Sequence, residues 1–343
     1  MGIYRAGSSG LFPLIFSSDR TSLAGMTPNI PSSAMVINWL ILITLGIIWG
    51  ASFLGVELAL TGFGPITLAA GRVSAAAIIL LVIALVYGDG LPRFQTATDK
   101  RIWLHCLGMA LFTNAIPFCL LSWGQQVVTS GFAGISMAVV PLFVLPLSHF
   151  LVPGELMSRI KVIGFLFGFA GVVMLIGGDK ILASAQPSPL MFIAQLACIT
   201  ASSCYAIGSI ITRLCPPVSA LSFAAAGLTI GGIILIPVAL LIEGGPNASF
   251  GAAFAGLAYL AVFPTAIATI LLTILVRRAG PPFLSLVNYQ VPVWAVVIGV
   301  FALDEALPGH FLMALAVILT GLFIAQFGRR RVVAGSIPKP PAG

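Results

Sequence analysis

Polar and aromatic side chains lie beside prolines inside long apolar stretches of this sequence. A proline removes a backbone donor from a helix and kinks it, which frees a carbonyl group. If such a stretch crosses a membrane, the freed group must face the protein interior or a cavity. We therefore expect a solute-binding cavity lined by residues near these prolines and by residues of the first and sixth stretches: Trp49, Ser52, Asn114, Met137, Tyr205, Ser209, Thr265, Asn288, Tyr289, Gln290 and Trp294. The alternative for each residue is a hydrogen bond between helices, worth about 0.6 kcal/mol.

Three ionisable residues, Glu57, Arg72 and His149, lie within apolar stretches or near their ends. A charge inside a bilayer costs about 2.5–3.5 kcal/mol on insertion scales, so such residues mark functional or structural sites. Glu57 and Arg72 would either form a structural ion pair between neighbouring helices or act electrostatically on a substrate or a gate. His149 would either pack against its neighbours or titrate in a proton-coupled cycle.

Patterns typical of enzymes are missing from the sequence. It contains no phosphate-binding loop of the Walker type, no HExxH, and no serine, histidine and aspartate set that would converge at one depth. The histidines His105, His149 and His310 are scattered and lack spaced carboxylates, so they predict no metal site. We expect no catalytic residue, no metal and no cofactor, and we expect that the chain is not an enzyme.

The elements that must position these residues are membrane-spanning helices. Hydrophobic residues make up 59% of the chain and charged residues 7%, with a mean hydropathy of +1.13. A soluble domain carries about 25% charged residues, so most of this surface must contact lipid. A span needs about 20 apolar residues. We predict an all-α membrane protein with ten transmembrane helices over residues 37–58, 65–87, 102–123, 128–151, 159–177, 190–212, 218–242, 251–276, 282–303 and 310–328.

Lysine and arginine predict the orientation of these helices. With both termini in the cytoplasm, 14 of the 16 basic residues fall in cytoplasmic segments, one (Lys180) on the opposite side and one (Arg72) inside a span. This bias follows the positive-inside rule, and we expect the protein in the cytoplasmic (inner) membrane of a bacterial-type cell. The net charge of +7 therefore suits the lipid surface, and we expect no nucleic-acid partner. Residues 1–36 and 329–343 are expected to be a disordered tail at each end.

The two halves of the chain resemble each other. Residues 114–116 match residues 265–267, and Pro141 matches Pro292, each 151 positions apart. Glu155 matches Glu305 after a slip of one residue. Because five spans is an odd number, the second copy would be inverted relative to the first. Inverted repeats allow two related conformations that open to opposite faces of a membrane.

These motifs resemble the EamA-type transporters of the drug/metabolite transporter superfamily. The resemblance begins with residues 49–53, Trp-Gly-Ala-Ser-Phe. It continues with a proline followed by an acidic residue in each half, Pro141 before Glu155 and Pro292 before Glu305, and with glycine-rich spans after them. It implies two five-helix repeats, at 37–177 and 190–328, around a central cavity, and export of amino acids, other metabolites or drugs. The second half has no arginine that corresponds to Arg72, so any role of Arg72 is asymmetric.

We therefore expect a secondary transporter that exports small metabolites, with amino acids favoured, by alternating access. Its partners would be a small-molecule substrate and the lipid bilayer, and the protein would be a monomer or a homodimer. The first alternative is a multidrug exporter of lipophilic cations, which a negative charge in the cavity such as Glu57 would support. The second is a non-transporting membrane sensor or a membrane enzyme.

Overall fold

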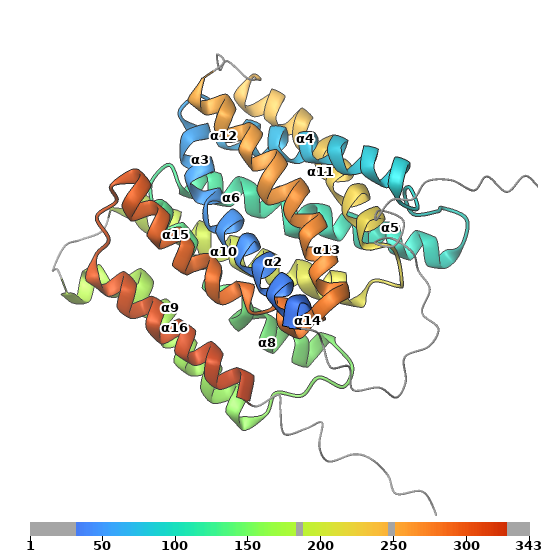
Figure 1. The fold of residues 1–343 in the computed structure, drawn as a ribbon. Coiled ribbons are helices and arrows are strands. Elements are labelled where there is room, and N and C mark those ends of the chain that lie inside the picture. Colours follow the sequence, from blue (N-terminus) through green and yellow to red (C-terminus); the bar gives the residue numbers. More distant parts are fainter. Residues whose placement is uncertain (1–31, 183–187, 246–250, 328–343) are drawn as a thin grey trace, which may run out of the picture.

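A computed structural model describes residues 32–182, 188–245 and 251–327, and these residues form a bundle of helices (Figure 1). The helices of the first half are α2 (Ser32–Gly50), α3 (Ser52–Leu60), α4 (Pro65–Tyr87), α5 (Ala97–Met109), η1 (Ala110–Ala115), α6 (Ile116–Gly124), α7 (Ser130–Ser136), η2 (Met137–Val139), α8 (Val140–Leu151) and α9 (Arg159–Leu182). Those of the second half are α10 (Pro189–Leu214), α11 (Ala220–Glu243), α12 (Ala252–Ala261), η3 (Val262–Ile267), α13 (Ala268–Ala279), α14 (Pro281–Leu284), α15 (Val287–Leu303) and α16 (Gly309–Phe327).

Most of the predicted spans are present as long apolar helices. Within the described ranges, nine helical segments are long and apolar enough to cross a membrane. The tenth predicted span, at 282–303, is represented by the shorter apolar helix Val287–Leu303, because a turn at residues 285–286 separates it from α14. The chain is therefore a helical membrane protein, and its tenth crossing remains a prediction.

The first helix begins earlier than predicted. It starts at Ser32, inside the expected tail, and Ala51 divides the first span into α2 and α3. The rest of that tail, residues 1–31, and the C-terminal tail at 329–343 lie outside the described residues.

Two of the spans contain a π-helical turn at matching positions. The turns η1 and η3 include the repeat residues Asn114 and Thr265. The Nδ2 atom of Asn114 donates to the carbonyl of Met109 at 3.2 Å, and the hydroxyl of Thr265 donates to the carbonyl of Leu260 at 2.8 Å. Each polar side chain thus donates to the carbonyl five residues earlier. Such turns are common at functional sites, and among the described residues one lies in each half.

Glycines set the closest approaches between helices. Helices α9 and α16 lie side by side (Figure 1), and a Cβ atom at Gly321 would lie 2.6 Å from the carbonyl oxygen of Gly164. Helix α15 packs on α2 in a similar way, since a Cβ at Gly46 would lie 2.9 Å from Cβ of Gln290. The residues Phe132, Leu175 and Ile318 are fully buried in the main core, which α2, α7, α9, α15 and α16 share.

Candidate functional site

A cavity of about 470 Å³ lies between α8, α10, α15 and α16. It lies at the end of the bundle where α8, α10 and α13 end and where α9 begins, which we call the basic end after Arg159, Lys161, Arg213, Arg277 and Arg278. Its polar lining combines hydroxyl, amide and charged groups: Ser148, His149, Glu155, Lys161, Ser209, Arg213, Ser285, Asn288, Tyr289 and Gln326. Prolines and aliphatic residues, including Pro141, Val144, Leu145 and Leu322, form the remainder.

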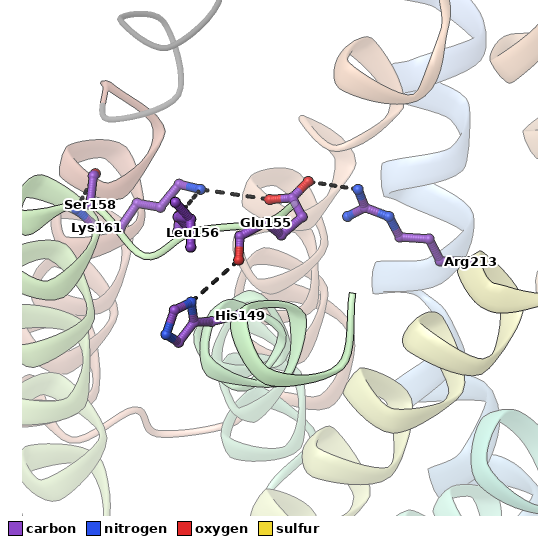
Figure 2. A network of polar contacts seen from close by, with 6 residues as sticks. All are labelled: His149, Glu155, Leu156, Ser158, Lys161 and Arg213. Atoms are coloured by element: carbon purple, nitrogen blue, oxygen red, sulfur yellow. Dashed lines mark hydrogen bonds and ion pairs between the residues drawn. The ribbon is translucent and has the colours of Figure 1, made fainter. Parts of the chain in front are cut away.

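Charged residues of both signs stand at the mouth of this cavity. The Glu155 carboxylate lies 2.6 Å from Nη2 of Arg213 and 3.8 Å from Nζ of Lys161. Figure 2 shows this carboxylate between the two basic side chains, with the His149 ring directed toward the backbone of Glu155. The Glu155 carbonyl lies 3.3 Å from Nδ1 of His149. The Arg213 side chain is 44% exposed, so the cavity reaches solvent at the basic end.

At the opposite end of the bundle, a carboxylate caps a helix terminus. Glu305, in the segment between α15 and α16, accepts hydrogen bonds from the backbone N–H of Ser130 at 2.7 Å and of Gly131 at 2.9 Å. These donors are the first residues of α7, where unsatisfied N–H groups and the helix dipole favour an anion. We call the contact of Glu305 with Ser130 and Gly131 the α7 cap. Nearby, Glu243 caps the start of α4 through Ile66 and Thr67 in the same way.

The two carboxylates that match in the repeat make different contacts. Glu305 caps α7, whereas its counterpart Glu155 binds side-chain cations. The sequence explains this difference, because the positions 151 residues after Ser130 and Gly131 are Pro281 and Pro282, which have no N–H to donate. The basic end is therefore open and lined with charges, while the other end is held by backbone hydrogen bonds.

A second group of polar and aromatic residues surrounds the turn η3. The Nε atom of Arg72 donates to Oγ1 of Thr265 at 2.9 Å, and the guanidinium carbon lies 3.9 Å from the centre of the Phe118 ring. The Phe118 and Tyr205 rings meet edge to face at 6.5 Å, and Nε1 of Trp49 donates to the carbonyl of Pro264 at 3.1 Å. We call Trp49, Arg72, Phe118, Tyr205 and Thr265 the π-turn cluster.

The structural ion pair considered for Glu57 and Arg72 is not present among the described residues. Arg72 is 9% exposed. It forms a hydrogen bond with Thr265 and a cation–π contact with Phe118, and both residues lie in other helical segments. Glu57 is partly buried on α3 and does not line the cavity.

The structure divides the predicted site residues into groups. Four of them line the cavity: Ser209, Asn288, Tyr289 and His149. Four others belong to the π-turn cluster: Trp49, Arg72, Tyr205 and Thr265. The others make local or packing contacts and lie outside the cavity lining. These are Ser52, bonded to the carbonyl of Trp49; Asn114, bonded within η1; Met137, packed on the core; and Gln290 and Trp294, which pack against Gly46 and Gly50 of α2.

Three charged residues of the cavity lining were not predicted from the sequence to belong to the site: Glu155, Lys161 and Arg213. Glu155 was predicted only to be a matching position of the repeat and of the family pattern, and Lys161 and Arg213 are two of the 14 basic residues that predict the orientation. Their clustering depends on α10 ending beside the loop between α8 and α9, which the span pattern alone does not specify. The acidic residue at matching positions of the two halves, Glu155 and Glu305, is the sequence feature that could have identified Glu155 as a site residue. Among the described residues, no group of three or more histidine, cysteine, aspartate or glutamate side chains is placed to hold a metal ion.

Comparison with known proteins identifies the family of this chain. The EamA-like transporter family matches residues 37–177 and again residues 192–327. The chain belongs to the EamA-like transporter family. Its relatives are transporters and not enzymes.

Individual relatives are distant but similar over nearly their full length. The uncharacterized inner membrane transporter YedA of Escherichia coli K12 is 26% identical over 87% of this EamA-like chain and 94% of its own length. A probable terminal-alkyne amino-acid exporter of Streptantibioticus cattleyicolor is 25% identical over 85% of this chain and 95% of its own. One crystal structure of a protein, 21% identical, superposes with a TM-score of 0.59 over 88% of this chain and 99% of its own, which supports the fold.

Proposed function

We propose that this EamA-like protein exports amino acids across the cytoplasmic membrane by alternating access. The observation that carries the proposal is the cavity at the basic end, which has charges of both signs at its mouth, together with the α7 cap at the other end. A cavity of about 470 Å³ lies within the range typical of small-molecule sites. Basic residues favour the cytoplasmic side, so the described conformation would receive substrate from the cytoplasm.

The charges at the cavity mouth suit a zwitterion. The ammonium group of an incoming amino acid can contact Glu155 while its carboxylate contacts Arg213 or Lys161. Each of these protein charges would then exchange its partner in the protein for a group of the substrate. Hydroxyl and amide groups of Ser209, Asn288 and Tyr289 continue the polar surface inward. The amino-acid exporter among the relatives agrees with this substrate class.

A multidrug exporter of lipophilic cations is less well supported. That alternative needs a net negative cavity, and Glu57 does not line it. The one acidic side chain in the lining, Glu155, already lies between Arg213 and Lys161. A lipophilic cation would therefore meet an excess of positive charge at the mouth.

Alternating access would use the two inverted five-helix repeats, at 37–177 and 190–328. In the described conformation the start of α7 is tied to Glu305, and in the second repeat Ser285, in the turn after α14, and the start of α15 line the cavity. Release of the α7 cap would open that end, and movement of the corresponding segment of the second repeat over the cavity would close the basic end. That closure would use contacts other than a cap by Glu155, because Pro281 and Pro282 have no N–H to donate. Both chain termini would lie in the cytoplasm throughout.

The test is counterflow of labelled amino acids in proteoliposomes that contain the purified protein, with and without a pH gradient. Accumulation of particular amino acids would support the proposal, and a rate that depends on the gradient would add proton coupling. If folded protein accumulates no amino acid but accumulates lipophilic cations, the proposal is wrong in its substrate class.

Replacing Asn288 with alanine should raise the half-saturating amino-acid concentration by about threefold to tenfold. This is the effect of losing one hydrogen bond of roughly 0.5–1.5 kcal/mol. The matched control is Thr320→Ala, whose hydroxyl is exposed on α16 and bonds within its own helix. Equal kinetics of the Asn288→Ala and Thr320→Ala proteins would remove Asn288 from the binding site.

A further inference from the structure

Arg72 is a buried cation without an anionic partner in the described part of the chain. It is 9% exposed, and its one hydrogen bond there joins Nε to the hydroxyl of Thr265. The described ion pairs involve Glu155 and none involves Arg72. A guanidinium group carries five N–H donors in a planar fork that suits a carboxylate, so the outer edge of this fork retains donors for a ligand.

The surroundings of Arg72 hold the guanidinium in place but do not neutralise its charge. Thr265 fixes Nε while its own hydroxyl donates to the carbonyl of Leu260 at 2.8 Å, so the orientation depends on the turn η3. The Phe118 ring lies under the guanidinium carbon at 3.9 Å. A cation–π contact is weaker than a pairing with a carboxylate, and buried charges in proteins are usually paired. The cluster therefore presents an oriented cation that an anion would stabilise.

The π-turn cluster lies next to the inner end of the cavity. Ser209 lines the cavity, and Tyr205 lies four residues earlier on the same face of α10, one turn farther from the basic end. The Tyr205 ring contacts the Phe118 ring, and Phe118 contacts Arg72. Arg72 is thus connected through Phe118 and Tyr205 to α10, the helix that carries the cavity residue Ser209.

We propose that Arg72 binds the carboxylate of the transported solute, with Thr265 as the residue that orients the guanidinium group. This inference rests on the proposed export of amino acids and adds the group by which the substrate is recognised. The site is asymmetric, because the second half has no arginine that corresponds to Arg72. A single solute would therefore bind in one orientation within an otherwise duplicated bundle.

The experiment compares an amino acid with its primary amide, for example leucine with leucinamide, as competitors of counterflow in proteoliposomes. The wild-type protein should prefer the acid by about tenfold or more, the size expected for a charge-assisted pair. In Arg72→Gln this preference should fall to about twofold or less, while Arg72→Lys, which keeps the charge, should retain part of it. Thr265→Val, which removes the orienting hydroxyl, should reduce the preference by about threefold.

The outcomes separate this inference from the proposed function. If the wild-type protein carries no amino acid, the proposed function fails before any variant is made, and the inference fails with it. If the wild-type protein carries amino acids and Arg72→Gln lowers uptake of acid and amide equally, Arg72 is a structural residue and the inference alone is overturned. Should Arg72→Gln not fold, an unchanged preference in both Arg72→Lys and Thr265→Val would also overturn it.

Discussion

Replacing Glu305 with glutamine should open the end of the protein that the α7 cap closes. The Glu305 carboxylate accepts two backbone hydrogen bonds at the start of α7, at 2.7 and 2.9 Å. A glutamine side chain has one acceptor oxygen, and its NH₂ group would face an N–H donor. Hydrogen bonds to a charged group are worth about 1.5–3 kcal/mol, so the closed arrangement should lose roughly tenfold or more in relative population.

A cysteine at position 130 reports this opening. Ser130 is 1% exposed, and Ser130→Cys keeps the backbone N–H that binds Glu305. We expect a membrane-impermeant thiol reagent to label Ser130→Cys about tenfold faster when Glu305→Gln is also present. The native cysteines are free thiols, so the rate for the parent protein is subtracted as background.

The control for charge is the neighbouring acidic residue. Asp304 is exposed and adopts a left-handed conformation, with a φ of 51°, which asparagine also tolerates. Asp304→Asn removes the same charge and leaves the α7 cap in place, so labelling of Ser130→Cys should stay at its original rate. Equal acceleration by Asp304→Asn and Glu305→Gln would mean that overall charge, and not the cap, closes this end.

Replacing Gly321 with alanine should destabilise the folded protein strongly. A Cβ atom at this position would lie 2.6 Å from the carbonyl oxygen of Gly164 and 2.7 Å from Cα of Gly168, so α9 and α16 would have to separate. Overpacking of this kind typically costs about 1–3 kcal/mol, and here backbone atoms, which cannot rotate away, cause the clash. We expect a clearly lower midpoint of thermal unfolding in detergent.

Gly177 on α9 provides the matched control. A Cβ atom there would meet nothing within 4 Å. Gly177→Ala should therefore be neutral or slightly stabilising, because alanine favours a helix by about 1 kcal/mol over glycine. If both alanine variants unfold at the same temperature, the contact between α9 and α16 does not depend on Gly321.

The sequence predicted the parts of the fold that depend on composition and local spacing. Apolar stretches specified the long helices. The start of α15 at Val287 was not predicted, because the stretch of mostly apolar residues before it shows no clear sign of the turn at residues 285–286.

The site was harder to predict because its contacts join distant segments. Arg72 bonds to Thr265, 193 residues away, and no local pattern in the sequence specifies that partner. Prolines pointed to helices of the site, but they did not distinguish Asn288, which lines the cavity, from Gln290, which packs on α2 two residues later. The direction of a side chain on a kinked helix depends on neighbouring helices, and a single sequence does not contain that information.

The measurement that tests alternating access most directly is paired thiol labelling in inside-out and right-side-out vesicles. The reporters are Ser209→Cys in the cavity and Ser130→Cys at the α7 cap. Before substrate is added, Ser209→Cys should react only from the cytoplasmic side and Ser130→Cys should react slowly from either side. A transported amino acid should slow labelling at position 209 and speed labelling at position 130 from the outside. Labelling of Ser209→Cys from the outside, or rates at both positions that a transported amino acid leaves unchanged, would contradict this mechanism.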